Sequence, residues 1–105
     1  MNEAKGPDAI SVEGSAELND DSSEIARIWI TDQAGSTIWI RAQLLEDPKV
    51  FGYLMSDTIR HGARAYATTW GLDEAQALQA IVDGLTQELR RQVGNISTIQ
   101  EGSLD

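Results

Sequence analysis

The sequence has no cysteine and a single histidine among its 105 residues. The absence of cysteine excludes disulfide bonds and thiol chemistry, and it is typical of a protein that works in the reducing cytosol. A zinc site normally needs several nitrogen or sulfur ligands, so we expect no metal centre. The glycines lack the strand, loop and helix spacing of a phosphate-binding motif, so we expect no nucleotide cofactor.

Long hydrophobic runs are also absent. The N-terminus has no hydrophobic signal segment and no stretch is long enough to span a membrane, so we expect a cytoplasmic protein without a membrane partner. With 41% hydrophobic and 24% charged residues, the composition favours a small folded domain over a chain that is disordered throughout.

Basic residues are few, and the formal net charge is -9. Residues 1–24 carry seven acidic side chains against one lysine, and residues 94–105 carry two acidic side chains and no basic one. Both ends are rich in Gly, Ser, Asn, Asp and Glu without a sustained apolar period, so we expect them to be disordered tails. An acidic chain is not steered towards phosphate backbones, which disfavours a nucleic-acid partner.

Two runs with period-two alternation, Ile25–Thr31 and Thr37–Ala42, are rich in β-branched and aromatic residues, as strands are. Between them, Asp32–Gly35 suits a type I turn followed by a glycine in the left-handed conformation. The result is a β-hairpin with a three-residue loop, in which Asp32 pairs with Ser36.

In this register, each strand residue faces one of its own kind. The predicted pairs are Arg27 with Arg41, Ile28 with Ile40, Trp29 with Trp39, and Ile30 with Ile38. One side of the hairpin is then an isoleucine face, made of Ile28, Ile30, Ile38 and Ile40. The other side is a Trp/Arg face, made of Arg27, Trp29, Trp39 and Arg41. Indoles beside guanidiniums can bind a partner by stacking, or they can be covered and serve packing.

Asp47 and Pro48 predict the start of a first helix, because Asp caps free amides and Pro is tolerated at the first helical position. Apolar residues then recur every three or four positions to about Thr68. A second helix is predicted to begin after Asp73 and to end at Gly94. The predicted fold is α+β, an antiparallel β-hairpin followed by a two-helix hairpin (ββαα).

Gly62 and Gly84 fall inside the predicted helices, where each costs about 1 kcal/mol relative to alanine. We expect the close approach of a helix at these positions, in preference to a ligand that rests against the backbone.

A two-stranded hairpin needs a third strand or a helix for independent stability. The predicted single domain, residues 25–93, is small and has no disulfide or metal, and such domains commonly gain stability by oligomerisation. We therefore expect a homodimer in which the hairpins pair or stack and bury Trp29 and Trp39.

The first helix carries a charged cluster with titrating chemistry. Asp57 lies four residues before His61, so its carboxylate can orient the imidazole, and Arg60 and Arg64 complete the cluster. No nucleophile stands at comparable spacing. We interpret the cluster as an ordinary ion network on a helix surface and keep a catalytic pair of Asp57 and His61 as the weaker alternative.

Three segments follow one another in a distinctive order. They are Arg27-Ile28-Trp29-Ile30, then Glu46-Asp47-Pro48 with Phe51-Gly52, then Arg60-His61-Gly62-Ala63-Arg64-Ala65-Tyr66. Over about residues 25–90 the chain resembles a family of small uncharacterised bacterial proteins known only as a domain of unknown function. The resemblance implies a soluble, stand-alone bacterial domain with the acidic tails outside the shared region, and it implies no activity and no catalytic residues.

These features favour a small cytoplasmic protein-interaction module that uses the Trp/Arg face, either as a homodimer or with another protein. The alternative is a small-ligand-binding domain with a pocket between the hairpin and the helices, where Arg41, Tyr66 and Trp70 form the rim. An enzyme that uses Asp57 and His61 is the least favoured class.

Overall fold

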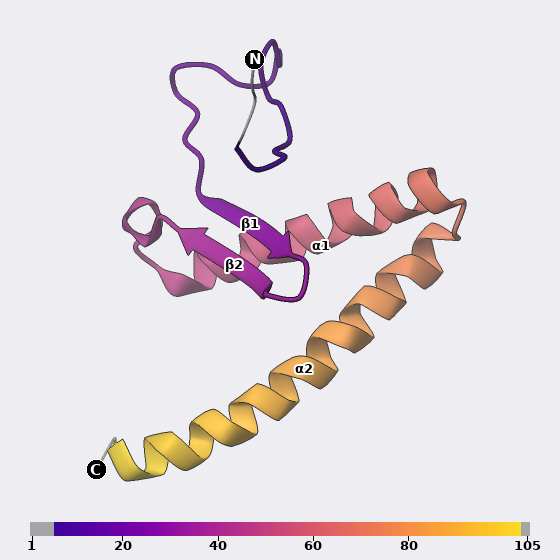
Figure 1. Ribbon diagram of the computed structural model, residues 1–105. Helices are drawn as coiled ribbons and strands as arrows, with labels where there is room; N and C mark the ends of the chain where they lie inside the picture. Colours follow the sequence, from indigo (N-terminus) through magenta and orange to yellow (C-terminus); the bar gives the residue numbers. More distant parts are fainter. Residues whose placement is uncertain (1–5, 104–105) are drawn as a thin grey trace. The chain divides into compact units, whose positions relative to one another are not determined.

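A computed structural model describes residues 6–103, with side chains described as far as residue 92. In chain order the elements are β1 (Ala26–Thr31), β2 (Gly35–Ile40), the short 3-10 helix η1 (Ala42–Leu44), α1 (Pro48–Trp70) and α2 (Glu74–Ser103) (Figure 1). This order confirms the predicted α+β fold of a β-hairpin followed by a two-helix hairpin. The chain comprises two compact units, Met1–Leu44 and Leu45–Asp105, and the predicted single domain includes parts of both.

The segment before the hairpin, residues 6–25, contains no helix or strand. It forms isolated turns, in one of which the Ser15 N–H donates to the Val12 carbonyl oxygen at 3.1 Å. The disorder expected for residues 1–24 stays a prediction, and residues 1–5 lie outside the described part of the chain.

The two strands pair antiparallel, but each residue of β1 faces a residue two positions earlier in β2 than the sequence predicts. The observed pairs are Ala26–Ile40, Arg27–Trp39, Ile28–Ile38, Trp29–Thr37, Ile30–Ser36 and Thr31–Gly35. The predicted register, with Trp29 opposite Trp39 and Arg27 opposite Arg41, is therefore wrong.

The loop causes this difference. It consists of Asp32–Ala34 and closes when the Ala34 N–H donates to the Thr31 carbonyl oxygen at 2.9 Å. The positive φ of 65° within the loop falls on Gln33, where the sequence gives no glycine signal. Gly35 has the predicted left-handed conformation, with a φ of 89°, but it is already the first residue of β2.

Both faces of the hairpin survive the change of register. Side chains alternate with period two, so only a shift by an odd number of residues exchanges the faces. Ile28 now opposes Ile38 on the isoleucine face, and Arg27 opposes Trp39 on the Trp/Arg face. The observed register removes a direct Arg–Arg opposition and sets a guanidinium against an indole, which favours it energetically.

Helix α1 begins and ends with strong local signals, as predicted at Asp47 and Gly71. The Asp47 carboxylate accepts a hydrogen bond from the Lys49 N–H at 2.9 Å, and Pro48 occupies the first helical position. At the other end, Gly71 adopts the left-handed conformation, with a φ of 71°, and donates to the Ala67 carbonyl oxygen at 3.0 Å.

Helix α2 begins as predicted but is longer. The Asp73 carboxylate accepts from the Gln76 N–H at 3.0 Å and caps the first turn. The predicted end at Gly94 is wrong, because α2 continues to Ser103. A single interior glycine costs only about 1 kcal/mol and does not stop a helix by itself. The disorder expected for residues 94–105 is not found for residues 94–103, which lie in α2, and residues 104–105 lie outside the described part of the chain.

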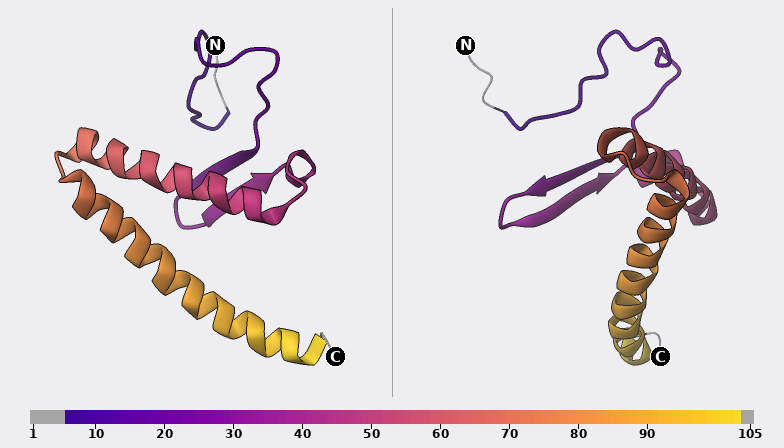
Figure 2. Two further views of the ribbon diagram at one scale, coloured as in Figure 1. Left: turned by 180° about the vertical axis from the view of Figure 1, so that it is seen from behind. Right: turned by 90° about the vertical axis from the view of Figure 1, so that its right-hand side faces the viewer.

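The two helices pack where they are joined and diverge from there (Figures 1 and 2). Ala63 and Ala77 are buried between them, and a Cβ added at Gly62 would lie 3.7 Å from the Ile81 Cδ1. Gly62 therefore lies at the helix contact that the sequence predicts. At Gly84, however, an added Cβ would meet no described atom within 4 Å, so the predicted close approach is not found there.

Candidate interaction surface on the hairpin

The Trp/Arg face is built by strand alternation. Arg27 and Trp29 come from β1 and Trp39 from β2, and Arg41 follows β2, where its N–H donates to the Ile25 carbonyl oxygen at 2.8 Å. This backbone bond extends the ladder by one pair and keeps Arg41 on the same face as the two indoles. The structure thus brings together all four residues that the sequence predicts for this face.

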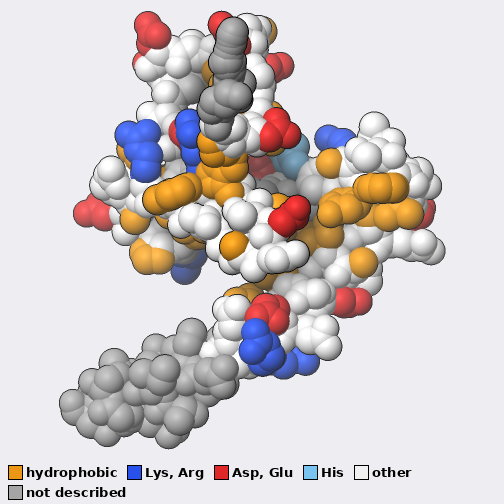
Figure 3. Space-filling view, in the orientation of Figure 1, with side chains coloured by type: hydrophobic (Ala, Val, Ile, Leu, Met, Phe, Trp, Pro, Cys, Tyr) orange, Lys and Arg blue, Asp and Glu red, His pale blue; other side chains and the backbone are white. Residues whose placement is uncertain are grey.

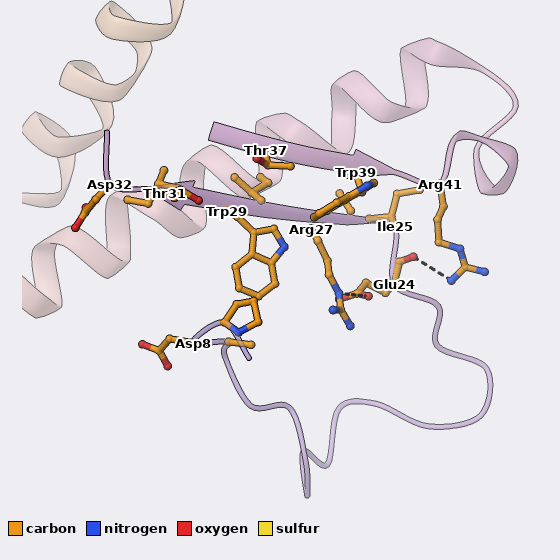
Figure 4. Close-up of a pocket in the computed structure, with 15 residues that line it drawn as sticks. Asp8, Glu24, Ile25, Arg27, Trp29, Thr31, Asp32, Thr37, Trp39 and Arg41 are labelled. Atoms are coloured by element: carbon orange, nitrogen blue, oxygen red, sulfur yellow. Dashed lines mark hydrogen bonds and ion pairs between the residues drawn. The ribbon is translucent and has the colours of Figure 1, made fainter. Parts of the chain in front are cut away.

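Glu24 connects the two arginines. Its carboxylate Oε1 accepts a hydrogen bond from the Arg27 Nε at 2.8 Å, and its backbone carbonyl accepts from the Arg41 guanidinium at 3.3 Å (Figure 4). The Arg27–Glu24 pair is exposed and therefore contributes little to stability, but it fixes where the guanidinium lies.

The two indoles differ in their surroundings. Trp39 is 61% exposed, whereas Trp29 is half-buried. The Nε1 atom of Trp29 is fully buried and finds no hydrogen-bond partner among the described residues. A buried indole N–H normally has an acceptor, so this donor is the least satisfied polar group of the surface.

An open concavity of about 1310 Å³ lies between this face and the N-terminal segment. Residues 7–9 and Glu24 form part of its lining, together with the Trp/Arg face. Figure 4 shows the Trp29 indole directed from β1 towards the N-terminal segment, with Asp8 beyond it. Sequence reasoning missed residues 7–9 and Glu24, because it assigned them to a solvated acidic tail.

Within the described residues of the unit Met1–Leu44, nothing covers the isoleucine face, since the exposed fractions of its four side chains range from 47% to 86%. Hydrophobic side chains are visible on the surface of both units in Figure 3. The contact with a core that the sequence predicts for this face stays a prediction.

The charged cluster on α1 has a different geometry from the predicted dyad. The His61 Nδ1 donates to the backbone carbonyl oxygen of Asp57 at 2.9 Å, while the Asp57 carboxylate lies 3.9 Å from it, beyond hydrogen-bond distance. Arg64 points to α2, with its Nε 3.7 Å from the Glu74 Oε2. The three side chains are exposed, and Arg64 serves the contact between the helices.

The remaining candidate sites are a small-ligand pocket, a metal site and a membrane span. Tyr66 and Trp70 are exposed on α1, and the small-ligand pocket predicted from them and Arg41 stays a prediction. Among the described side chains, those of residues 6–92, no group of three or more His, Asp or Glu could hold a metal ion. Within residues 6–103, no helix is long and apolar enough to cross a membrane.

Comparison with known proteins identifies the family. The chain is similar to a protein whose solved structure is described as "Structure of a putative pyruvate dehydrogenase from the photosynthetic bacterium Rhodopseudomonas palustrus CGA009", with 35% sequence identity and a TM-score of 0.62. The match covers 84% of this chain and 89% of that one. No curated protein matches the sequence.

A family model described as "Domain of unknown function (DUF5076)" matches residues 10–93. The match begins earlier than the resemblance over residues 25–90 and takes in most of the segment before the hairpin. The expectation that the acidic N-terminal tail lies outside the shared region is therefore wrong for residues 10–24. The chain belongs to the DUF5076 family of domains of unknown function.

Proposed function

We propose that the chain is a small cytoplasmic protein-interaction module that binds a segment of another protein on its Trp/Arg face. The observation that carries the proposal is Trp29, whose buried Nε1–H has no acceptor among the described residues although the side chain lines an open concavity. A partner segment that takes the place of residues 7–9 beside this indole would expose the donor and supply its acceptor, and so stabilise the bound state.

The residues around Trp29 define the chemistry of the partner. Trp39 offers an exposed indole, and tryptophan and arginine are enriched among the residues that dominate binding energy. The Arg41 guanidinium donates to a backbone carbonyl, which carries no net charge, so a carboxylate of the partner adds a charge-assisted hydrogen bond. The favoured partner is an extended segment that presents a carboxylate and a backbone carbonyl.

The dimensions of the concavity support a polypeptide over a small molecule. Its volume of about 1310 Å³ exceeds the roughly 300 to 1,000 Å³ of typical small-molecule pockets, and it is open to solvent. A second copy of the chain suits this face less well, because each copy would bring two further arginines to it. Dimerisation through Trp29 and Trp39 is therefore the weaker form of the proposal.

A quantitative capture experiment from bacterial lysate tests the proposal. The wild type is compared with the double variant Trp29→Ala, Trp39→Ala and with the matched double variant Tyr66→Ala, Trp70→Ala, which removes two exposed aromatic side chains from α1. Circular dichroism first establishes that all three fold. We expect a defined partner that the hairpin variant loses and the helix variant keeps.

A second variant separates a role in binding from a role in folding. Arg41→Gln removes the guanidinium and its charge and leaves a shorter polar side chain, so it should weaken capture of the same partner while leaving the thermal unfolding curve unchanged. Equal loss of partners in both aromatic variants, or no loss in either, would contradict the proposal.

A further inference from the structure

Helix α2 carries an apolar stripe that α1 does not cover. Packing against α1 involves the first turns of α2, where Ala77 is buried and Ile81 is half-buried. Beyond these turns the helices diverge, and the exposed fractions of Val82, Leu85 and Leu89 rise from 38% to 42% and 48%. A long helix gains most of its stability from the packing of its apolar face, so this stripe requires a further element.

The spacing of the stripe indicates what kind of element covers it. Its members are separated alternately by three and four residues, and in the sequence they are Val82, Leu85, Leu89, Gln92, Ile96 and Ile99. This is the 3.5-residue repeat of a coiled coil, with Val82 at an a position and Leu85 at a d position. Because α2 is continuous to Ser103, the repeat lies on one unbroken helix.

We propose that α2 pairs with α2 of a second copy of this chain in a parallel two-stranded coiled coil. The first heptad of the seam, with β-branched Val82 at a and Leu85 at d, favours two parallel strands, whereas Ile96 and Ile99 at the last a and d positions favour larger assemblies. Gln92 is the one polar residue of the seam, and in a parallel pair it meets Gln92 of the other copy. Gln92 stands at a d position, and pairing the two glutamines across the seam sets the register of the two helices, as a polar residue at an a position does in other coiled coils.

The charged residues of α2 support a second copy of the chain as the partner and a parallel orientation of the two helices. Asp83, Arg90 and Arg91 fall outside the seam, and Glu88 is the only charged residue at the flanking e and g positions of residues 81–93. A parallel pair sets g against e of the other copy and therefore opposes no like charges along this stretch. An antiparallel pair sets g against g, and a register centred on position 88 would bring the two Glu88 carboxylates together.

The surroundings of the seam also agree with the proposal. Gly84 falls at an outward c position, where an added Cβ would meet no described atom within 4 Å. Glu88 is already bonded within its own helix, to the Arg91 Nε at 3.2 Å and to the Gln92 Nε2 at 3.0 Å. The charged groups beside the seam are thus compensated without the partner helix, and the pairing rests on the apolar residues.

Cysteine cross-linking tests the geometry directly, because the chain has no cysteine of its own. Under mild oxidation Leu89→Cys should give a disulfide-linked dimer, since a parallel pair brings position 89 of both copies face to face. Gln87→Cys, two residues away on the outward side of α2, should remain monomeric on a non-reducing gel.

Sedimentation equilibrium measures the energetic consequence. The wild type should be a dimer, and Leu89→Glu should raise its dissociation constant by about tenfold or more, because one buried leucine per copy is lost. Gln87→Glu makes the same change of charge on the same helix turn and should leave the dissociation constant unchanged. Circular dichroism confirms that both variants remain helical.

Three results would overturn the proposal. The first is a wild type that sediments as a monomer at its highest soluble concentration. The second is equal cross-linking through positions 87 and 89. The third is a monomer that Leu89→Glu unfolds and Gln87→Glu does not, which would mean that the hairpin unit of the same chain covers the stripe.

Discussion

Replacing Gly84 with alanine should stabilise the protein by about 1 kcal/mol, because glycine in a helix interior is less favourable than alanine by roughly that amount. The added methyl group meets no described atom within 4 Å, so no steric cost offsets the gain. Position 84 also lies on the outward side of the proposed coiled coil, so dimerisation does not change this expectation.

Gly62→Ala is the same substitution at a position where α1 contacts α2, and its effect can be compared with that of Gly84→Ala. Its added Cβ would lie 3.7 Å from the Ile81 Cδ1, which is an ordinary van der Waals separation. We therefore expect stabilisation of about 1 kcal/mol here as well, with a small further gain from the new apolar contact. The reverse change at an exposed position of α2, Ala80→Gly, should cost about the same amount and serves as the control.

Thermal unfolding followed by circular dichroism at fixed protein concentration measures all three variants. A change of about 1 kcal/mol corresponds to a shift of roughly 4 to 8 °C in the melting temperature of a domain of this size. Destabilisation by Gly62→Ala would refute the described separation of α1 and α2. Destabilisation by Gly84→Ala would mean that a backbone or a ligand does approach this position closely.

Two further predictions concern the hairpin register and the ion pair between Glu88 and Arg91. The double variant Ile28→Cys, Ile38→Cys should form a cross-strand disulfide, whereas Ile28→Cys, Ile40→Cys should not, and mass spectrometry under non-reducing conditions distinguishes the two registers. The hydrogen bond from Arg91 lowers the pKa of Glu88, so the contribution of this pair is present at pH 7 and is lost as the pH falls through the lowered pKa. In an NMR titration, Arg91→Gln should raise the pKa of Glu88 towards its ordinary value, and an unchanged pKa would contradict this cause.

The sequence predicts best where a single residue type settles the local structure. The helix starts are set by Asp47 with Pro48 and by Asp73, whose carboxylates accept hydrogen bonds from free backbone N–H groups. The end of α1 is set by Gly71, which adopts the left-handed conformation. The two faces of the hairpin were predictable for a similar reason, because alternation along each strand decides them before any pairing is known.

The register of the hairpin could not be predicted from the same alternation. Two registers that differ by two residues place the same side chains on the same faces, so only the loop and the cross-strand pairs distinguish them. In the loop, Gln33 adopts the left-handed conformation, which a glutamine in the sequence does not predict.

Two other features, the end of α2 and the role of Glu24, were predicted incorrectly for related reasons. Gly94 resembles a helix stop, yet glycine only permits the left-handed conformation that commonly ends a helix and does not impose it. Glu24 was assigned to an acidic tail by composition, whereas its role depends on the position of two arginines that the hairpin brings near it.

Site-specific photocrosslinking in cells tests the central claim most directly, which is that the Trp/Arg face contacts a partner protein. Thr37 lies opposite Trp29 on that face, and its neighbour Ser36 lies opposite Ile30 on the isoleucine face. The two positions are therefore adjacent in the chain but lie on opposite faces of the hairpin. A photoreactive residue at position 37 should capture a defined protein, and the Trp29→Ala, Trp39→Ala background should abolish that product. Capture of the same protein from position 36 alone, or a product at position 37 that survives the loss of both indoles, would contradict the claim.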